Sequence, residues 1–191
     1  MYNIQNIISE SINVKQQIFN DKYLIERMDE AAVMCVESLK HQGKIHFCGN
    51  GGSAADAQHL AAELSGRFYY DRPPLNAEAL HVNTSYLTAV GNDYSFDEIY
   101  ARVLKGTAHG GDVLFAISTS GNSKNILKAI ETAKQLNVKV VGMTGESGGL
   151  MKDCCDVLLN VPSSCTPRIQ EAHIMIGHII CEIIESIIFP R

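Results

Sequence analysis

The first forty residues have the apolar spacing of two helices. Apolar side chains recur there at intervals of three and four positions, which places them on one helical face. The first stripe consists of Ile4, Ile7, Ile8 and Ile12. The second consists of Leu24, Ile25, Met28, Ala31, Ala32, Cys35, Val36 and Leu39, and it stops before Gly43. The first helix has little of its own chain to pack on, so we expect it to complete a bundle between subunits with a C-terminal helix.

From residue 44 onward the hydrophobic period becomes that of an alternating α/β chain. Short β-rich runs cover residues 44–48, 77–82, 112–118, 138–143 and 156–161, and helical segments such as 54–64 and 125–136 separate most of them. Strands that alternate with helices pair in parallel through right-handed crossovers. We therefore predict a three-layer α/β/α sandwich with a five-stranded parallel sheet. Without repeats or linkers, residues 1–191 are interpreted as a single domain with residues 1–40 as a helical extension.

A long apolar run near the C-terminus is interpreted as a buried helix. Residues 174–189 read IMIGHIICEIIESIIF, which is shorter than the roughly 20 residues that span a bilayer. The run also contains His178, Glu182 and Glu185, which a membrane span disfavours. We expect this helix to pack against its own core and against another subunit.

Charge and composition exclude several classes of protein. The 191 residues include 16 Lys and Arg against 21 Asp and Glu, a formal net charge of -5. Without clusters of basic residues, neither nucleic acid nor an anionic membrane surface is an expected partner. The 6 Cys do not form a disulfide framework and no signal peptide is recognisable, so a cytoplasmic location is predicted.

Two loops at predicted strand ends have the composition of an anion site. The first, CGNGGSAADAQH (48–59), contains Gly49, Gly51 and Gly52, which allow close backbone approach, and Ser53, which is expected to cap the following helix. In a parallel sheet, ligands bind at the carboxyl ends of the strands.

The second loop, AISTSGNSKN (116–125), places four hydroxyl groups around Gly121 at a helix start, where free N–H groups favour an anion. These hydroxyls belong to Ser118, Thr119, Ser120 and Ser123. Either loop alone is equally consistent with an ordinary turn, but the pair favours a phosphate site. No P-loop or dinucleotide fingerprint is present, which makes a nucleotide ligand less expected.

Titratable and polar side chains lie on the two helices expected near these loops. His59 and Glu63 are spaced i, i+4, and Gln170 and His178 share one face of the C-terminal helix. This set is suited either to acid–base catalysis or to Zn²⁺ binding. From the residues alone the metal is the less expected of the two, because Gln is an infrequent zinc ligand and the spacing is not that of a zincin motif. Elsewhere, Asn92 and Asp93 follow Gly91, where they shape a turn or hydrogen-bond a polyol.

Four sequence blocks together resemble one known family. They are CGNGGSAADAQHLAAELSGRF, AVGNDYSFDEIYARVL, AISTSGNSKNILKAI and RIQEAHIMIGHIICEIIE, and they occur in order over nearly the whole chain. The chain is similar to the sugar-isomerase (SIS) domain, with a flavodoxin-like sheet, and within it to the phosphoheptose isomerases. The resemblance implies an aldose–ketose isomerase that converts sedoheptulose 7-phosphate to D-glycero-D-manno-heptose 7-phosphate in heptose biosynthesis for lipopolysaccharide or related glycans.

The resemblance also implies roles for particular residues. Glu63 and His178 form the catalytic pair. His59, Glu63, Gln170 and His178 hold one Zn²⁺ per subunit of a homotetramer. Substrate contacts fall on Asn50, Gly51, Gly52, Ser53, Glu63, Asn92, Asp93, Ser118, Thr119, Ser120, Ser123 and Gln170. Pro167 stands where some members carry an acidic residue, so the role of that acid is in doubt for this chain.

Several alternatives stay open from the sequence. Glu63 is assigned the carbon proton and His178 the oxygen protons, but the reverse assignment is also possible. A Glu63 that binds zinc is not a fully free base, so the metal is structural, inhibitory or a Lewis acid. Rival functions are a non-catalytic SIS regulator, a replication-initiator-binding relative, or an isomerase of another phosphosugar such as arabinose 5-phosphate.

Overall fold

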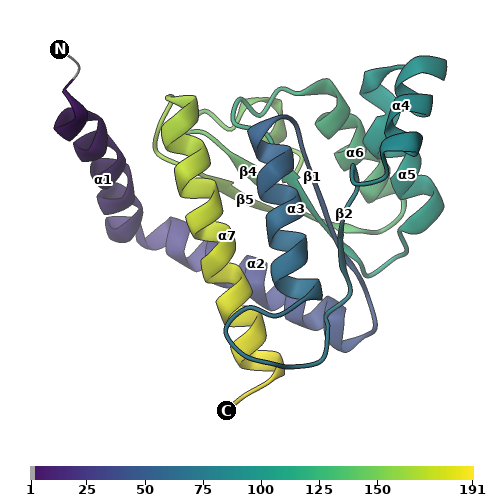
Figure 1. Cartoon of the computed structure of the whole chain (residues 1–191), viewed down its shortest axis with the longest axis horizontal. Coiled ribbons are helices and arrows are strands. Elements are labelled where there is room, and N and C mark those ends of the chain that lie inside the picture. Colours follow the sequence, from purple (N-terminus) through teal and green to yellow (C-terminus); the bar gives the residue numbers. More distant parts are fainter. Residues whose placement is uncertain (1–2) are drawn as a thin grey trace.

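A five-stranded parallel sheet forms the centre of the molecule (Figure 1). The structure is a computed structural model that describes residues 3–191. The strand order is β2-β1-β3-β4-β5, the flavodoxin-like order, and every pair of neighbours is parallel. The strands are β1 (Ile45–Gly49), β2 (Ala77–Ala79), β3 (Val113–Ile117), β4 (Lys139–Thr144) and β5 (Val157–Asn160). The predicted strands are therefore confirmed, with ends shifted by at most three residues.

Helices cover both faces of this sheet, which confirms the three-layer prediction. One apolar core joins the sheet to four helices: α1 (Ile4–Asn20), α2 (Lys22–Lys40), α3 (Gly52–Ser65) and α7 (Thr166–Ile188). The core on the other face includes three: α4 (Thr84–Asp93), α5 (Ile99–Thr107) and α6 (Lys124–Gln135). Two short 3₁₀ helices cover Phe96–Glu98 and Gly149–Met151.

The central strands are buried along their whole length because both faces are covered. Every residue of β1 and β3 is buried, as expected for strands in a parallel sheet between two helical layers. Phe47 and Phe115 are register partners on these strands, and their rings stack with centroids 5.0 Å apart. Full burial of such a side chain stabilises the fold by roughly 1.5–3 kcal/mol.

Short polar side chains fix the starts of three helices. Asn3, Asp21 and Asn83 each accept a hydrogen bond from the backbone N–H three residues later, at the first turns of α1, α2 and α4. Such a cap satisfies one of the N–H groups that have no partner inside the helix. The two helices predicted for the first forty residues are confirmed, and Asp21 separates them.

The structure corrects the interpretation of the Gly91–Asn92–Asp93 segment. This segment is not a free turn but the last part of α4, a helix that the sequence pattern did not predict. The helix ends with a hydrogen bond from the N–H group of Tyr94 to the carbonyl of Val90. A Gly-Asn-Asp sequence is common at a helix end as well as in a turn, which explains the error.

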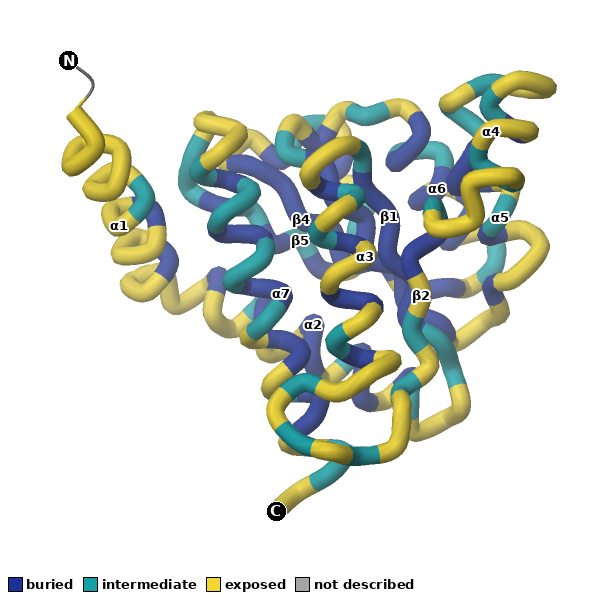
Figure 2. The backbone as a smooth tube through the Cα atoms, viewed as in Figure 1, coloured by how far each residue is buried: buried dark blue, intermediate teal, exposed yellow. Residues whose placement is uncertain are grey.

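Several large apolar side chains of α1 are exposed. Only Val14 and Ile18 of this helix are buried, whereas Ile4 is 68% exposed and Phe19 74% exposed. Figure 2 shows the contrast between α1 and the buried interior of the molecule. Across residues 3–191, no helix has the length and apolar character that are needed to cross a membrane.

Candidate active site

Three predicted side chains meet between α3 and α7. His59 Nε2 lies 3.1 Å from Glu63 Oε1 and 2.9 Å from His178 Nε2. One ligand atom from each residue lies within 4.8 Å of the other two. The i, i+4 spacing aligns His59 with Glu63 on α3. The helix α7 runs beside α3 (Figure 1), and His178 of α7 contacts His59. The structure therefore brings together three of the four residues of the predicted quartet.

Close packing of the two helices makes this meeting possible. Gly177 precedes His178 on α7, and a Cβ atom at position 177 would lie 2.5 Å from both terminal methyl carbons of Leu60 on α3. Leu60 is fully buried, so it has no free space to move into. Gly177 is thus the contact point that allows the imidazole of His178 to reach His59.

The cluster opens into a pocket of about 580 Å³. Glu63 and His178 line it together with residues of α1, α7 and the segment after α3, namely Lys15, Phe68, Tyr69, Glu171, Ile174, Met175, Ile179 and Glu182. The ring of Phe68 lies 5.8 Å from that of His178, centroid to centroid. The His59 side chain is half exposed and that of Glu63 is 25% exposed, so a small molecule can approach both groups.

Gln170 on α7 lies apart from these three residues, next to the beginning of α3. A Cβ atom on Gly52 would lie 2.4 Å from Nε2 of Gln170, so the amide of Gln170 packs directly on the first glycine loop. At a rise of 1.5 Å per residue, Gln170 and His178 are separated by about 12 Å along α7. The face of α7 that carries them therefore extends from the loops to the cluster of His59, Glu63 and His178, called the acid–base cluster below for its titratable groups.

The first glycine loop is held in place by side chains from other segments. Asn50 forms a reciprocal pair of amide hydrogen bonds with Asn125 at the start of α6, with N···O distances of 2.9 and 2.8 Å. The hydroxyl of Tyr100 on α5 donates to the carbonyl of Gly49. Sequence reasoning missed both supporting residues, because nothing local in the sequence shows that Asn125 and Tyr100 face β1.

Ser53 does not cap the following helix, contrary to the prediction. The helix α3 begins at Gly52, its N-cap is Gly51 and no side chain caps it. Gly51 has φ of 56°, a conformation that favours glycine and that turns the chain sharply after the strand. Ser53 consequently lies inside the first turn of α3, where it is buried.

The second loop borders a smaller pocket of about 270 Å³ at the same edge of the sheet. Of the four predicted hydroxyl residues, Thr119 and Ser120 line it, whereas Ser118 Oγ and Ser123 Oγ lie 3.0 Å from each other. Asn122 of the same loop also lines the pocket. Sequence reasoning missed the remaining lining residues, which follow β4 and β5 or belong to α7: Gly145, Glu146, Ser147, Ser163, Ser164, Thr166 and Ile169. None of these residues is Lys or Arg, so any anion here would be held by hydroxyls and N–H groups.

Asn92 and Asp93 are not brought to the cluster. Both side chains are exposed at the end of α4, on the face of the sheet opposite to α7, and Asn92 Nδ2 donates to Asp93 Oδ1 over 3.0 Å. Asp56, which sequence reasoning did not select, lies one turn before His59 on α3. Burial raises the pKa of Asp56, and its proximity to His59 acts in the opposite direction.

The residues of the cluster fit a metal ion by their chemistry. Two imidazole nitrogens and a carboxylate oxygen are ligand types that Zn²⁺ prefers. The two Nε2 atoms also face each other at hydrogen-bond distance, so both lone pairs can point at one ion when neither nitrogen carries a proton. Gln170 packs on Gly52 instead of joining the three, so a fourth ligand from this residue requires its side chain to change rotamer.

Comparison with known proteins places the chain in a family. Residues 9–145 match the model of the SIS domain. The chain is 53% identical to a phosphoheptose isomerase of Mycobacterium bovis over 188 residues, which cover 98% of this chain and 96% of that protein.

Two solved structures agree along nearly the whole length. The phosphoheptose isomerase of Neisseria gonorrhoeae is 44% identical with a TM-score of 0.90, and the alignment covers 96% of this chain and 97% of that one. A phosphoheptose isomerase from Francisella tularensis is 39% identical with a TM-score of 0.92 and covers 96% of each chain. With this fold and this acid–base cluster, the chain belongs to the phosphoheptose isomerases of the SIS domain family.

Proposed function

We propose that this chain is an aldose–ketose isomerase that converts sedoheptulose 7-phosphate to D-glycero-D-manno-heptose 7-phosphate. The observation that carries the proposal is the shared pocket of Glu63 and His178, because an enediol isomerisation needs one group for the carbon proton and one for the oxygen protons. Phosphoheptose isomerases that are 53% and 50% identical to this chain support the same reaction.

Each proton in the reaction has a group that can move it. The Glu63 carboxylate removes a proton from C1 of the ketose, and the electron pair forms the C1–C2 double bond of a cis-enediol as O2 accepts a proton from His178. The imidazole then takes the proton of O1 while Glu63 returns a proton to C2, which leaves the aldehyde at C1. Both groups end in their starting protonation states, and a positioned acid or base contributes roughly 10²–10⁴ in rate.

His59 is suited to orient this pair. Its Nε2 atom contacts both Glu63 and His178, so it restricts the rotation of the carboxylate and of the facing ring. We assign Zn²⁺ to His59, Glu63 and His178, with Gln170 as the fourth ligand after a change of rotamer. While the ion is bound, only the second carboxylate oxygen of Glu63 and Nδ1 of His178 would be free to carry protons. When bound, the metal would supply Lewis-acid stabilisation of negative charge on the sugar oxygens.

The phosphate group is assigned to the hydroxyl-rich loops. Thr119 and Ser120 line the smaller pocket, and the helix α6 begins directly behind it at Lys124. Free N–H groups at a helix start favour an anion without basic side chains. The proposed substrate contacts at Asn50, Gly51, Gly52, Ser53, Ser118 and Ser123 adjoin this edge of the sheet, whereas a contact at Asn92 or Asp93 requires a site outside the pocket.

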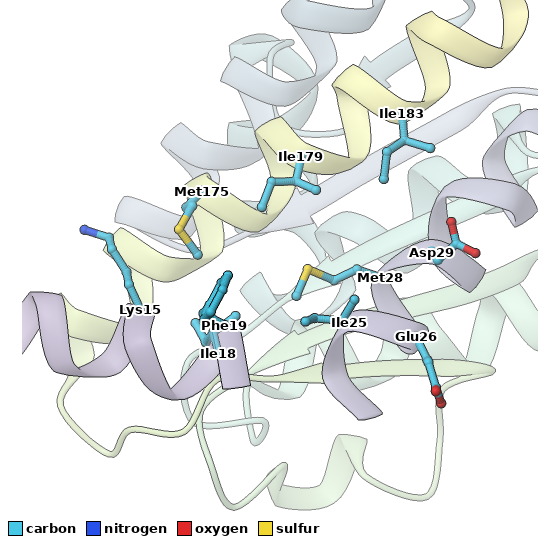
Figure 3. A pocket seen from close by; sticks show the side chains of 10 residues that line it. All are labelled: Lys15, Ile18, Phe19, Ile25, Glu26, Met28, Asp29, Met175, Ile179 and Ile183. Atoms are coloured by element: carbon cyan, nitrogen blue, oxygen red, sulfur yellow. The ribbon is translucent and has the colours of Figure 1, made fainter. Parts of the chain in front are cut away.

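A homotetramer is supported by an apolar groove along α1, α2 and α7. The groove has a volume of about 640 Å³ and is lined mainly by apolar side chains from the three helices, which point into it in Figure 3. They are Ile18, Phe19, Ile25, Met28, Met175, Ile179 and Ile183. An exposed apolar surface of this kind is typical of an interface between subunits. Residues 1–191 then act as a single SIS domain whose N-terminal extension, residues 1–40, serves assembly.

The biological setting follows from the proposed reaction. The product is a phosphorylated heptose, so we place the enzyme in heptose biosynthesis for lipopolysaccharide core or related glycans. A cytoplasmic location is part of the same proposal, since sugar phosphates are made and used there.

An NMR assay of the purified protein with sedoheptulose 7-phosphate tests the reaction. We expect an aldose signal to grow in, and arabinose 5-phosphate to give no product. Glu63→Gln should reduce turnover by at least about 10²-fold while inorganic phosphate still binds. Glu182→Gln is the matched control, because Glu182 lines the same pocket outside the cluster. If the wild-type protein binds the sugar phosphate without converting it, the function is that of a regulator.

Metal analysis, followed by chelation and re-addition of Zn²⁺, tests the metal. We expect one Zn²⁺ per chain, an activity that falls on chelation and an activity that returns with the ion. A chelated protein of full activity would exclude a catalytic role for zinc, and a chelated protein of increased activity would identify the metal as inhibitory.

A further inference from the structure

A buried arginine joins the two helices that carry the acid–base groups. Arg72 lies in the segment between α3 and β2, and its side chain is only 2% exposed. Its Nε atom donates to Oε2 of Glu185 on α7 over 2.9 Å, and the Glu185 side chain is 1% exposed. A buried ion pair of this kind is retained only where both charges find further partners.

The other nitrogens of Arg72 hold the end of α3. Nη2 donates to the backbone carbonyl of Glu63 over 2.9 Å, and Nη1 donates to the carbonyls of Leu64 at 2.7 Å and Gly66 at 3.1 Å. The last carbonyls of a helix have no partner within it, and a cation there also interacts favourably with the helix dipole. One guanidinium group therefore fixes the backbone of the residue to which we assign the carbon proton.

Glu185 completes the connection from the side of α7. Its two carboxylate oxygens also accept hydrogen bonds from the backbone N–H groups of Phe68 at 3.0 Å and Tyr69 at 2.9 Å. Burial by itself raises the pKa of Glu185, but these bonds and the Arg72 charge outweigh it and keep the pKa below its usual range. The carboxylate is therefore ionised, and it anchors the same segment whose Phe68 ring packs against His178.

We propose that Arg72 and Glu185 are positioning residues that set the distance between Glu63 and His178. This inference rests on the proposed function of the cluster. Stability alone does not require the pair, since buried ion pairs can often be replaced by apolar residues of similar size. What an apolar pair cannot supply is the set of hydrogen bonds to the carbonyl of Glu63 and to the segment that contains Phe68.

Three variants separate positioning from stability. The double variant Arg72→Met with Glu185→Leu removes both charges together, so no unpaired charge is buried. Arg72→Lys keeps the ion pair but lacks the planar fork that reaches several carbonyls at once. Val138→Ala is the control, because Val138 is a buried residue in the core on the opposite face of the sheet.

For each variant, the melting temperature, kcat and KM for sedoheptulose 7-phosphate, and the affinity for Co²⁺ without substrate are measured. Co²⁺ serves as a visible-absorption probe of the cluster formed by His59, Glu63 and His178. In the double variant we expect kcat and Co²⁺ affinity to fall by roughly 10–100-fold, with KM nearly unchanged. Arg72→Lys should give an intermediate loss, and Val138→Ala should lower only the melting temperature.

The proposal is overturned if the double variant, once folded, loses no more kcat and no more Co²⁺ affinity than Val138→Ala. If the double variant does not fold, Arg72→Lys decides the question by the same two measurements. A wild-type protein without turnover would refute the proposed function instead, and the Co²⁺ affinities would then test the positioning role alone.

Discussion

Acidification should destabilise the protein through one buried histidine. His173 lies on the inner face of α7 and is fully buried, with Nε2 3.1 Å from the backbone carbonyl oxygen of Thr144 at the end of β4. Within residues 3–191, its Nδ1 atom has no hydrogen-bond partner. Burial lowers the pKa of His173 from 6.5 to about 4, although the bond to Thr144 favours the charged form. The neutral ring therefore donates its Nε2 proton to Thr144.

The sign and the size of the effect follow from the two pKa values. As the pH falls below 6.5, the unfolded chain binds a proton at position 173 while the folded chain does not, so unfolding becomes more favourable. The loss accumulates from pH 6.5 down to about 4, where the folded form also takes up the proton. A difference of about 2.5 pKa units at 1.36 kcal/mol per unit corresponds to about 3 kcal/mol.

Urea unfolding of His173→Gln measures this contribution. Gln keeps an N–H group for Thr144 but does not titrate, so between about pH 7 and about pH 4.5 the variant should lose roughly 2–3 kcal/mol less free energy of unfolding than the wild type. The pKa of His46 is also lowered by burial, but this contribution is common to both proteins and cancels. His41→Gln, at an exposed histidine, should behave as the wild type. Equal losses in the wild type and in His173→Gln would refute the reasoning.

Three further predictions concern packing, phosphate and assembly. Gly177→Ala places a methyl group 2.5 Å from Leu60, so urea unfolding should show a loss of about 1–3 kcal/mol in the free energy of unfolding. Leu60→Ala in the same chain should relieve part of the clash, and an unchanged urea midpoint of Gly177→Ala would contradict the prediction. Gly121→Ala should weaken the binding of inorganic phosphate at least tenfold, or by about 1.4 kcal/mol, as measured by calorimetry. The reason is that φ is +67° at Gly121 and that a Cβ atom there would lie 2.1 Å from the carbonyl oxygen of Gly148. Equal phosphate affinity would argue against this loop as the phosphate site. Ile25→Glu, in the apolar groove, should lower the molar mass seen by light scattering with unchanged circular dichroism, and an unchanged mass would exclude this groove as an interface.

Features with a local sequence pattern were predictable in this chain. The five strands and most helices follow from the period of apolar residues, and the i, i+4 spacing is enough to align His59 with Glu63. Their meeting with His178 was expected from the polar stripe on the C-terminal helix. The loops after β1 and β3 were identifiable because glycine and hydroxyl residues gather at strand ends.

Features that depend on tertiary contacts were not predictable. Arg72 and Glu185 are separated by 113 residues, and neither stands out from other charged residues in the sequence. Asn125 looks like an ordinary residue of a first helical turn until β1 brings Asn50 beside it. The short helix that ends at Asp93 was not predictable because glycine and asparagine favour turns as much as helix ends.

The number of residues in α7 between His178 and Glu185 determines how these two side chains are oriented relative to each other. Each residue turns an α-helix by about 100°, so these two side chains, nearly two full turns apart, point in almost the same direction. Inserting a single residue between them would rotate one against the other by about 100° and separate the arginine contact from the acid–base cluster. The chain should therefore tolerate inserted residues beyond the end of α7 at Ile188 far better than within this interval, which makes the C-terminus the place for a fusion or a tag.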